Sequence, residues 1–319
     1  MKRRLGILAL IVCMSGTSAA LQTICAQDST TIVMTGDILL DRGVRKRIEA
    51  AGIDQLFSPA IDSLFCSSDF VIGNLECPAT HIKAPAFKKF VFRAEPEWLT
   101  ALRKHGFTHL NLANNHSIDQ GRRGLTDTYT NIRNAGMTPI GAGASMKEAA
   151  NAVLITDTPR PVYILSSQRL PLENFAWLPA QPSVSQEPRD SLLNRIRQIR
   201  IHEPAACIII SLHWGWEHTT EPTLEQKITA RQLIDAGADA LVCHHSHTLQ
   251  RIEFYHDKPI YYSIGNFIFD QTKPINTQTA IVRLTITADT MKAETIPVVI
   301  ERCAPQLQSS TSLPFSSSN

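Results

Sequence analysis

Short apolar runs alternate with amphipathic segments along most of this chain. The apolar, β-branched runs predict strands, and segments with helical spacing that close at a glycine predict helices. The predicted strands are 31–34, 70–72, 108–112, 137–140, 162–165, 207–212, 240–243, 258–264, 280–287 and 294–301. The predicted helices are 44–51, 58–66, 96–104, 124–134, 190–201 and 224–236.

This alternation predicts one α/β domain over residues 27–305, with a β-rich C-terminal part. The run 207–212 is apolar throughout, which is typical of a strand in a sheet covered on both faces. The stretch 170–187 is rich in proline and predicts irregular structure. The Ser-rich segment 306–319 is expected to be a disordered tail.

The N-terminus has the three parts of a signal peptide, which we expect to span residues 1–26. Lys2, Arg3 and Arg4 precede the apolar run 5–14, and small residues follow at 15–20. The apolar run is too short for the roughly 20 residues that cross a bilayer, although an uncleaved anchor is the alternative interpretation. We therefore expect an exported protein, periplasmic or extracellular, without a transmembrane segment after cleavage.

The composition of the 319-residue chain is typical of a folded globular protein, with 43% hydrophobic and 19% charged residues. The net charge of +2 neither favours nor excludes an anionic partner, and no basic block beyond the N-terminus indicates nucleic-acid binding. The seven cysteines include no CxxC pair, so a zinc knuckle is not expected. Cys207 and Cys243 are expected to be buried thiols, and pairing of Cys66 with Cys77 is left open.

Residues able to bind metal ions follow the predicted strands repeatedly. They are Asp37, Glu76, Asn114, Asn115, His116, His213, His244, His245 and His247. Each alone is more often a turn residue or a core histidine, but ligands of open α/β sheets gather at the carboxyl ends of strands. His245 and His247 lie two residues apart, which would place both on one side of an extended segment.

The metal-binding set comprises two carboxylates, an asparagine and three histidines. Such a mixture suits Mn²⁺, Fe²⁺ or Zn²⁺ better than Mg²⁺ or Ca²⁺, which prefer oxygen ligands. Six ligands exceed the needs of one tetrahedral site. They fit two metal ions about 3.5–4 Å apart that share a carboxylate, a pair that activates water for phosphoryl transfer.

Six motifs in this order carry a family resemblance. They are 36–43 (GDILLDRG), 73–76 (GNLE), 113–119 (ANNHSID), 213–217 (HWGWE), 245–250 (HSHTLQ) and 263–267 (SIGNF). Over residues 31–271 the chain resembles the CapA family of capsule and poly-γ-glutamate synthesis proteins, a branch similar to the calcineurin-like metallophosphoesterases. The resemblance implies a layered α/β sandwich with mixed sheets and a metal site at the C-terminal ends of the strands.

The resemblance also implies a role for each matching residue. Asp37 and His247 would bind the first metal ion, Glu76 would bridge, and Asn115, His213 and His245 would bind the second. His116 would be the general acid, Arg42 would clamp a phosphate or carboxylate, and Glu217 and Asn266 would contact substrate or be a solvated Glu and a capping Asn. The wider superfamily begins with Asp-x-His, whereas Leu39 stands at the histidine position here.

These residues leave three functions open. The first is an exported metal-dependent hydrolase of a phosphoester or of a cell-surface polymer. The second is a non-catalytic accessory of envelope or capsule polymer synthesis that binds an anionic polymer and works with the synthesis machinery. The third is a structural remnant without metal, which the retained ligand residues disfavour.

Overall fold

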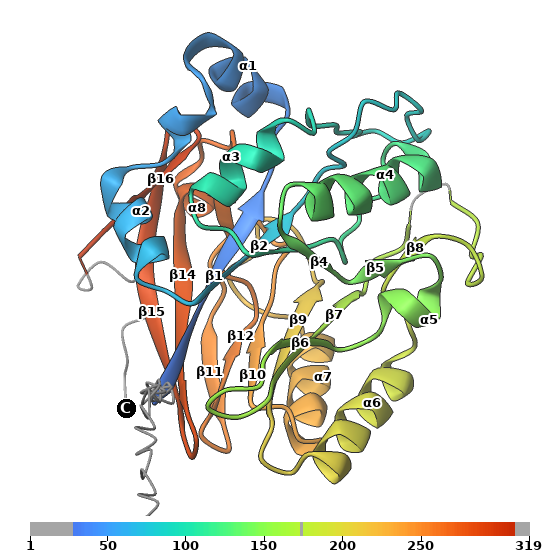
Figure 1. Cartoon of the computed structure of the whole chain (residues 1–319), viewed down its shortest axis with the longest axis vertical. Coiled ribbons are helices and arrows are strands. Elements are labelled where there is room, and N and C mark those ends of the chain that lie inside the picture. The colour runs from blue at the N-terminus through green and yellow to red at the C-terminus, as the bar shows by residue number, and fades with distance from the viewer. Residues whose placement is uncertain (1–27, 173–174, 310–319) are drawn as a thin grey trace, which may run out of the picture.

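The computed structural model describes residues 28–172 and 175–309, and it has four layers (Figure 1). Two mixed β-sheets pack face to face, and helices cover their outer faces, as the α/β alternation predicted. The expected signal peptide and residues 310–319 of the expected tail lie outside the described residues. Within the described residues, no helix is both long enough and apolar enough to cross a membrane.

The first sheet has eight strands in the order β16-β15-β14-β1-β2-β3-β4, and β13 also pairs with β1. Its strands are β1 (Ser29–Ile38), β2 (Phe70–Leu75), β3 (His109–Asn111), β4 (Thr138–Ile140), β13 (Asn266–Ile268), β14 (Gln278–Thr287), β15 (Met291–Glu301) and β16 (Ala304–Leu307). Strands β1 to β4 are parallel, whereas β14 to β16 are antiparallel. The carboxyl ends of β1, β2 and β3 therefore meet at one edge.

The second sheet has six strands in the order β11-β12-β10-β9-β7-β6. Its strands are β6 (Val153–Thr156), β7 (Val162–Gln168), β9 (Cys207–His213), β10 (Ala240–Val242), β11 (Ile252–Tyr255) and β12 (Lys258–Tyr261). The central strands β7, β9, β10 and β12 are parallel. A separate pair joins β5 (Ala142–Gly143) to β8 (Ser183–Val184).

The helices divide between the two outer faces. They are α1 (Arg42–Ala51), α2 (Pro59–Cys66), α3 (Trp98–Lys104), α4 (Gly121–Asn134), α5 (Met146–Ala149), α6 (Arg189–His202), α7 (Leu224–Asp235) and α8 (Pro274–Thr277), with a 3₁₀ turn at Ile53–Leu56. Figure 1 shows α3 and α4 on one side of the molecule and α6 beside α7 on the opposite side. These two helix groups lie outside the first and the second sheet, respectively.

Side-chain alternation along the strands divides the core between the layers. On β9, Ile208 and Ile210 pack with α6 and α7, whereas Ile209 belongs to the cluster between the sheets. On β1, Ile32 also faces the space between the sheets, and Val33 packs against the helices of the other side. Each such fully buried side chain stabilises the fold by roughly 1.5–3 kcal/mol, so the alternation holds the two sheets together.

The structure extends the predicted pattern and corrects part of it. Strands β5, β6, β8, β11 and β13 were not predicted, because each is only two to four residues long and has too few positions to show a pattern. The folded chain continues to Leu307, beyond the expected limit at residue 305, because β16 pairs with β15. Cys66 and Cys77 are both free, and Cys207 and Cys243 are buried thiols, as predicted.

Candidate metal centre

The register of the parallel strands aligns three polar residues at the base of the site. Asp37 on β1 pairs with Asn74 on β2, which pairs with Asn111 on β3. Their side chains form a buried ladder, in which Asn111 Nδ2 donates to Asn74 Oδ1 at 3.0 Å and Asn74 Nδ2 donates to Asp37 Oδ1 at 2.8 Å. The amides therefore fix the Asp37 carboxylate, which is fully buried.

A close backbone approach brings β13 to the other side of Asp37. A Cβ at Gly36 would lie 2.1 Å from the carbonyl oxygen of Gly265, so any side chain here would push the strands apart. With glycine at this position, Asp37 N donates to the Gly265 carbonyl at 3.0 Å. Asn266 follows directly and accepts from His247 Nδ1 through its Oδ1, with the two atoms 2.9 Å apart.

One group of potential ligands comprises Asp37, Glu76 and His247. One ligand atom from each lies within 4.8 Å of the others. The closest approaches are 3.3 Å between His247 Nδ1 and Asp37 Oδ2, and 3.9 Å between His247 Nε2 and Glu76 Oε1. Glu76 comes directly after β2, so strands of the first sheet supply both carboxylates.

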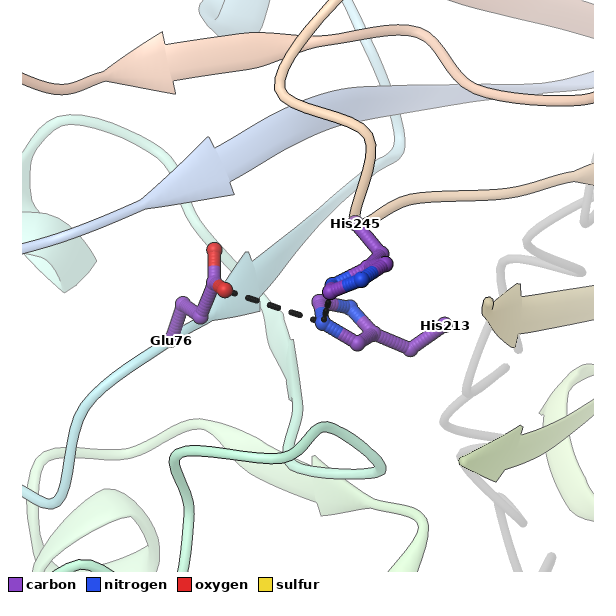
Figure 2. A group of neighbouring side chains, drawn as sticks. All are labelled: Glu76, His213 and His245. Carbon is purple, nitrogen blue, oxygen red and sulfur yellow. Dashed lines mark hydrogen bonds and ion pairs between the residues drawn. The ribbon is translucent and has the colours of Figure 1, made fainter. Parts of the chain in front are cut away.

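A second group comprises Glu76, His213 and His245, which point toward one another in Figure 2. His213 Nε2 lies 3.6 Å from Glu76 Oε1 and 3.2 Å from His245 Nδ1. Asn115 Oδ1 lies 2.8 Å from the same His213 nitrogen. The two groups share Glu76, whose carboxylate lies near His247 of the first group and near His213 and His245 of the second.

The electrostatics of the first group suit a cation. Burial and the charge of Asp37 raise the pKa of Glu76 well above its usual range. Burial alone would lower the pKa of His247, but Glu76 and Asp37 raise it to about 9. Glu76 Oε2 is buried and has no hydrogen-bond partner among the described residues. The site therefore brings two carboxyl groups together in a buried place and leaves one acceptor oxygen unused, which fits a divalent metal ion.

The imidazoles of the second group are held neutral. Burial, followed by the neighbouring His245, lowers the pKa of His213 well below its usual range. Burial also lowers the pKa of His245 to about 3. A neutral imidazole has a lone pair available for a metal ion. The donor set of carboxylate oxygens, an amide oxygen and neutral imidazoles fits Mn²⁺, Fe²⁺ or Zn²⁺.

The local backbone of the 245–247 segment differs from the expectation. His245 and His247 have φ values of 100° and 55°, so this segment is a turn and not an extended strand. Non-glycine residues seldom adopt positive φ, and such strain is concentrated at functional sites. One imidazole enters each ligand group, and the two ring centroids lie 6.2 Å apart. The expectation that both face one site therefore holds, but it does so through this bend and not through the alternation of an extended strand.

His116 lies next to Asn115 on the loop after β3. Its Nδ1 lies 2.9 Å from Asp119 Oδ2, and its ring centroid lies 4.3 Å from that of Phe92. Burial lowers the pKa of His116, while Asp119 opposes this effect. Lys88 Nζ contacts Asp119 Oδ1 at 2.5 Å and donates to the Asn115 carbonyl at 2.9 Å. This buried lysine–aspartate pair thus fixes the loop that carries both Asn115 and His116.

Arg42 and Glu217 lie outside the two ligand groups. Arg42 forms an ion pair with Asp270, and its guanidinium carbon lies 5.1 Å from the Phe92 ring and 5.3 Å from the Phe269 ring. Phe92 also contacts His116, which connects Arg42 to the edge of the site. Glu217 is half exposed, and its carboxylate lies 3.6 Å from His218 Nε2.

Several residues that support the site had no predicted role. They are Asn74, Asn111, Lys88, Asp119, His218, Asp270 and Asn276. Asn276 Nδ2 donates to the His247 carbonyl at 2.9 Å and contacts His218 Nδ1 at the same distance. Asn74 and Asp119 lie inside the quoted motifs, which was an available signal, whereas Asn276 lies outside them.

Comparisons with known proteins show the family and the fold of this chain. The family model described as "Bacterial capsule synthesis protein PGA_cap" matches residues 31–271. The PGA biosynthesis protein CapA of Bacillus subtilis is 31% identical over 284 residues, which cover 88% of this chain and 74% of that protein. A probable polyglutamine synthesis accessory protein of Mycobacterium tuberculosis is 31% identical over 297 residues, covering 76% of this chain and 75% of that protein.

Among solved structures, a 5'-nucleotidase precursor from Thermus thermophilus matches with a TM-score of 0.51 and 13% sequence identity. The match covers 87% of this chain, which spans 56% of the length of that structure. At this identity the likeness shows the fold alone. The expected metallophosphoesterase-like fold is confirmed.

Proposed function

The chain belongs to the bacterial capsule synthesis protein family, as its motifs predicted, and on this premise we propose that it is an exported metal-dependent hydrolase of the metallophosphoesterase type. Its substrate would be a phosphoester or a bond in an anionic cell-surface polymer. One observation carries the proposal. The carboxylate of Glu76 is shared by two buried groups of potential ligands, which is the arrangement that two adjacent cations require.

Each ligand residue has a place in this proposal. Asp37 and His247 would hold one cation, Asn115, His213 and His245 would hold the other, and Glu76 would serve both groups. Two bound divalent cations, Mn²⁺, Fe²⁺ or Zn²⁺, would supply a water of lowered pKa and stabilise negative charge on the reacting group. The amide ladder beneath Asp37 keeps its carboxylate in place as substrate binds.

His116 acts as the general acid. Asp119 accepts from Nδ1 and stabilises the protonated ring, so that Nε2 delivers a proton to the leaving oxygen. Lys88 pairs with the same Asp119 carboxylate, and the Phe92 ring packs against the imidazole.

Arg42 and Glu217 act at the edge of the site. The guanidinium of Arg42 orients a phosphate or carboxylate of the substrate, for which it exchanges part of its contact with Asp270. Glu217 lies close enough for its negative charge to raise the pKa of both Glu76 and His247. Its half-exposed carboxylate orients a polar group of the substrate.

A second candidate is a non-catalytic accessory of envelope polymer synthesis that binds an anionic polymer. The printed names of the relatives favour it, since one is a PGA biosynthesis protein and another a probable polyglutamine synthesis accessory protein. Its metal centre would then bind polymer without cleaving it. Both candidates place the protein in the cell envelope, where the synthesis machinery is a possible partner.

A metal-loaded activity screen separates the candidates. The purified protein is loaded with Mn²⁺ or Zn²⁺, its metal content is measured, and p-nitrophenyl phosphate, its bis-ester and γ-glutamyl polymers are tested as substrates. We expect His213→Ala and His245→Ala to lose bound metal and turnover together. Metal binding without turnover of any substrate class would favour the accessory role, and absence of metal after loading would overturn both.

A further inference from the structure

A cavity of about 540 Å³ lies beside the metal centre, on the other side of the end of β9. Its lining includes Arg169, Arg189, Trp214, Trp216 and Gln226. The backbone N–H of Arg169 donates to the carbonyl of His213 at 2.9 Å, so a single strand end separates the cavity from a metal-ligand residue.

The topology brings two helix N-termini to this cavity. α6 leads into β9 and α7 leads out of it, and both helices pack on the outer face of the second sheet. In such parallel crossovers the helices begin at the carboxyl edge of the sheet. Pro188 to Asp190 at the start of α6, and Thr223, Glu225 and Gln226 at the start of α7, accordingly line the cavity. The dipoles of the two helices favour anions there, while the capping box of α7 already pairs the backbone N–H groups of Thr223 and Gln226.

The arginines add positive charge to the cavity. Arg169 is half-buried, and its Nη1 donates to the carbonyl of Glu187 at 2.6 Å. Burial, followed by the charge of Arg189, lowers the pKa of Arg169. The two guanidinium groups therefore lie close enough to repel each other, while the charges of Glu187 and Glu225 also reach Arg169 and act in the opposite direction.

Gln226 provides an independent sign of a missing ligand. Its side chain is 3% exposed and lines the cavity. Oε1 accepts from Thr223 N at 2.9 Å as part of the helix cap, but Nε2 has no hydrogen-bond partner among the described residues. A buried N–H group without a hydrogen-bond partner destabilises the folded protein by about 1–3 kcal/mol, so few buried N–H groups lack a partner.

The acidic residues near the cavity do not occupy its interior. Asp190 and Glu225 are exposed at its mouth, where a first helical turn favours carboxylates. Asp190 Oδ1 lies 3.7 Å from Arg189 Nε in an exposed ion pair, with which a bound anion would compete. Trp216 is 71% exposed at the same mouth and offers an apolar surface to a ligand that carries methylene groups.

From these contacts we propose that the cavity between α6 and α7 binds an oxyanion group, a carboxylate or a phosphate, at one end of an elongated anionic ligand. Arg169, Arg189 and Gln226 Nε2 donate to this group. That the other end of the ligand reaches the metal centre rests on the function proposed above, whereas oxyanion binding itself does not.

Two substitutions and a matched control test the proposal in the full chain. Gln226→Glu keeps the Oε acceptor for Thr223, because glutamate also serves in a capping box, but it replaces the free N–H donor with negative charge. Arg189→Gln removes a cation from the cavity. Arg197→Gln removes the same charge from an exposed position farther along α6 and serves as the control.

Calorimetric titration then measures binding of tetraglutamate, of its neutral counterpart tetraglutamine, and of inorganic phosphate. We expect wild type and Arg197→Gln to bind tetraglutamate equally and tetraglutamine far more weakly. Gln226→Glu and Arg189→Gln should each weaken tetraglutamate binding about ten-fold or more. If the same two variants instead weakened the binding of phosphate and left tetraglutamate unbound, the site would be supported and its ligand would be a phosphate.

Equal affinity of Gln226→Glu and wild type for both anions, or no binding of either, would overturn the proposal. Metal content and p-nitrophenyl ester turnover are measured on the same samples. Loss of anion binding with metal and turnover retained supports the cavity without depending on the metal centre. If no sample turned over the esters but the variants still differed in anion binding as expected, the proposed hydrolase function would be contradicted and the anion site would stand.

Discussion

Replacing Glu76 by glutamine should change the stability of the protein in opposite directions with and without metal. The Glu76 carboxylate is 1% exposed, and its nearest cationic group is the His247 ring at 3.9 Å. Burial and the charge of Asp37 raise its pKa well above the usual value. A carboxyl whose pKa is raised on folding destabilises the native state as pH rises above the unfolded value, so the ionised form is unfavourable near pH 7.5.

The expected magnitudes follow from burial and from metal binding. Because folding raises the pKa of this buried carboxyl, keeping it in the native state costs stability at pH 7.5, and metal-free Glu76→Gln should therefore be more stable than metal-free wild type. A ligand at about 100 times its Kd stabilises the native state by roughly 2.7 kcal/mol. Wild type should gain at least this from Mn²⁺, whereas the variant should gain far less, because both ligand groups lose their shared carboxylate.

Urea unfolding at pH 7.5, in chelator and in excess Mn²⁺, measures this reversal. Glu187→Gln is the control, because Glu187 is also buried but pairs with Arg195 at 2.8 Å. The change in the free energy of unfolding caused by Glu187→Gln should be the same in chelator and in excess Mn²⁺. If Glu76→Gln were destabilising in chelator and gained as much from Mn²⁺ as wild type, the assignment of Glu76 as the shared ligand would be refuted.

Three further outcomes are expected. His116→Gln should retain metal and lose turnover about 10²–10⁴-fold, and unchanged turnover would remove its acid role. Burial lowers the pKa of His109 to about 4, so its contribution to stability is present above pH 6.5 and falls by about 2 kcal/mol at pH 5; His109→Gln should reduce the pH dependence of urea unfolding by that amount. Phe107→Ala should lower the free energy of unfolding by about 3–5 kcal/mol in the same assay, because this ring packs against Phe65 and Phe267. A smaller loss would show that neighbouring side chains move in to fill the cavity.

The periodicity of the chain was enough to predict the α/β layers and the strand ends at which potential ligand residues gather. Strand periodicity depends on local spacing, so the run 207–212 and the helix 224–236 were recognisable without tertiary information. The placement of Asp37, Glu76 and His213 at strand ends followed for the same reason. Short strands such as β13 were missed, because their pairing comes from close backbone approach at Gly36 and not from their own apolar pattern.

What the amino-acid sequence determined by itself was which residue types follow which strands, and hence the class of metal that such donors suit. The tertiary structure decided that the two ligand groups share Glu76 and that positive φ at His245 and His247 directs one imidazole to each group. It also decided that Arg169 lines the cavity between α6 and α7. The first of these relations joins Glu76 to histidines more than a hundred positions away in the chain. These relations depend on strand register and on how the two sheets pack, which no local pattern in the chain encodes.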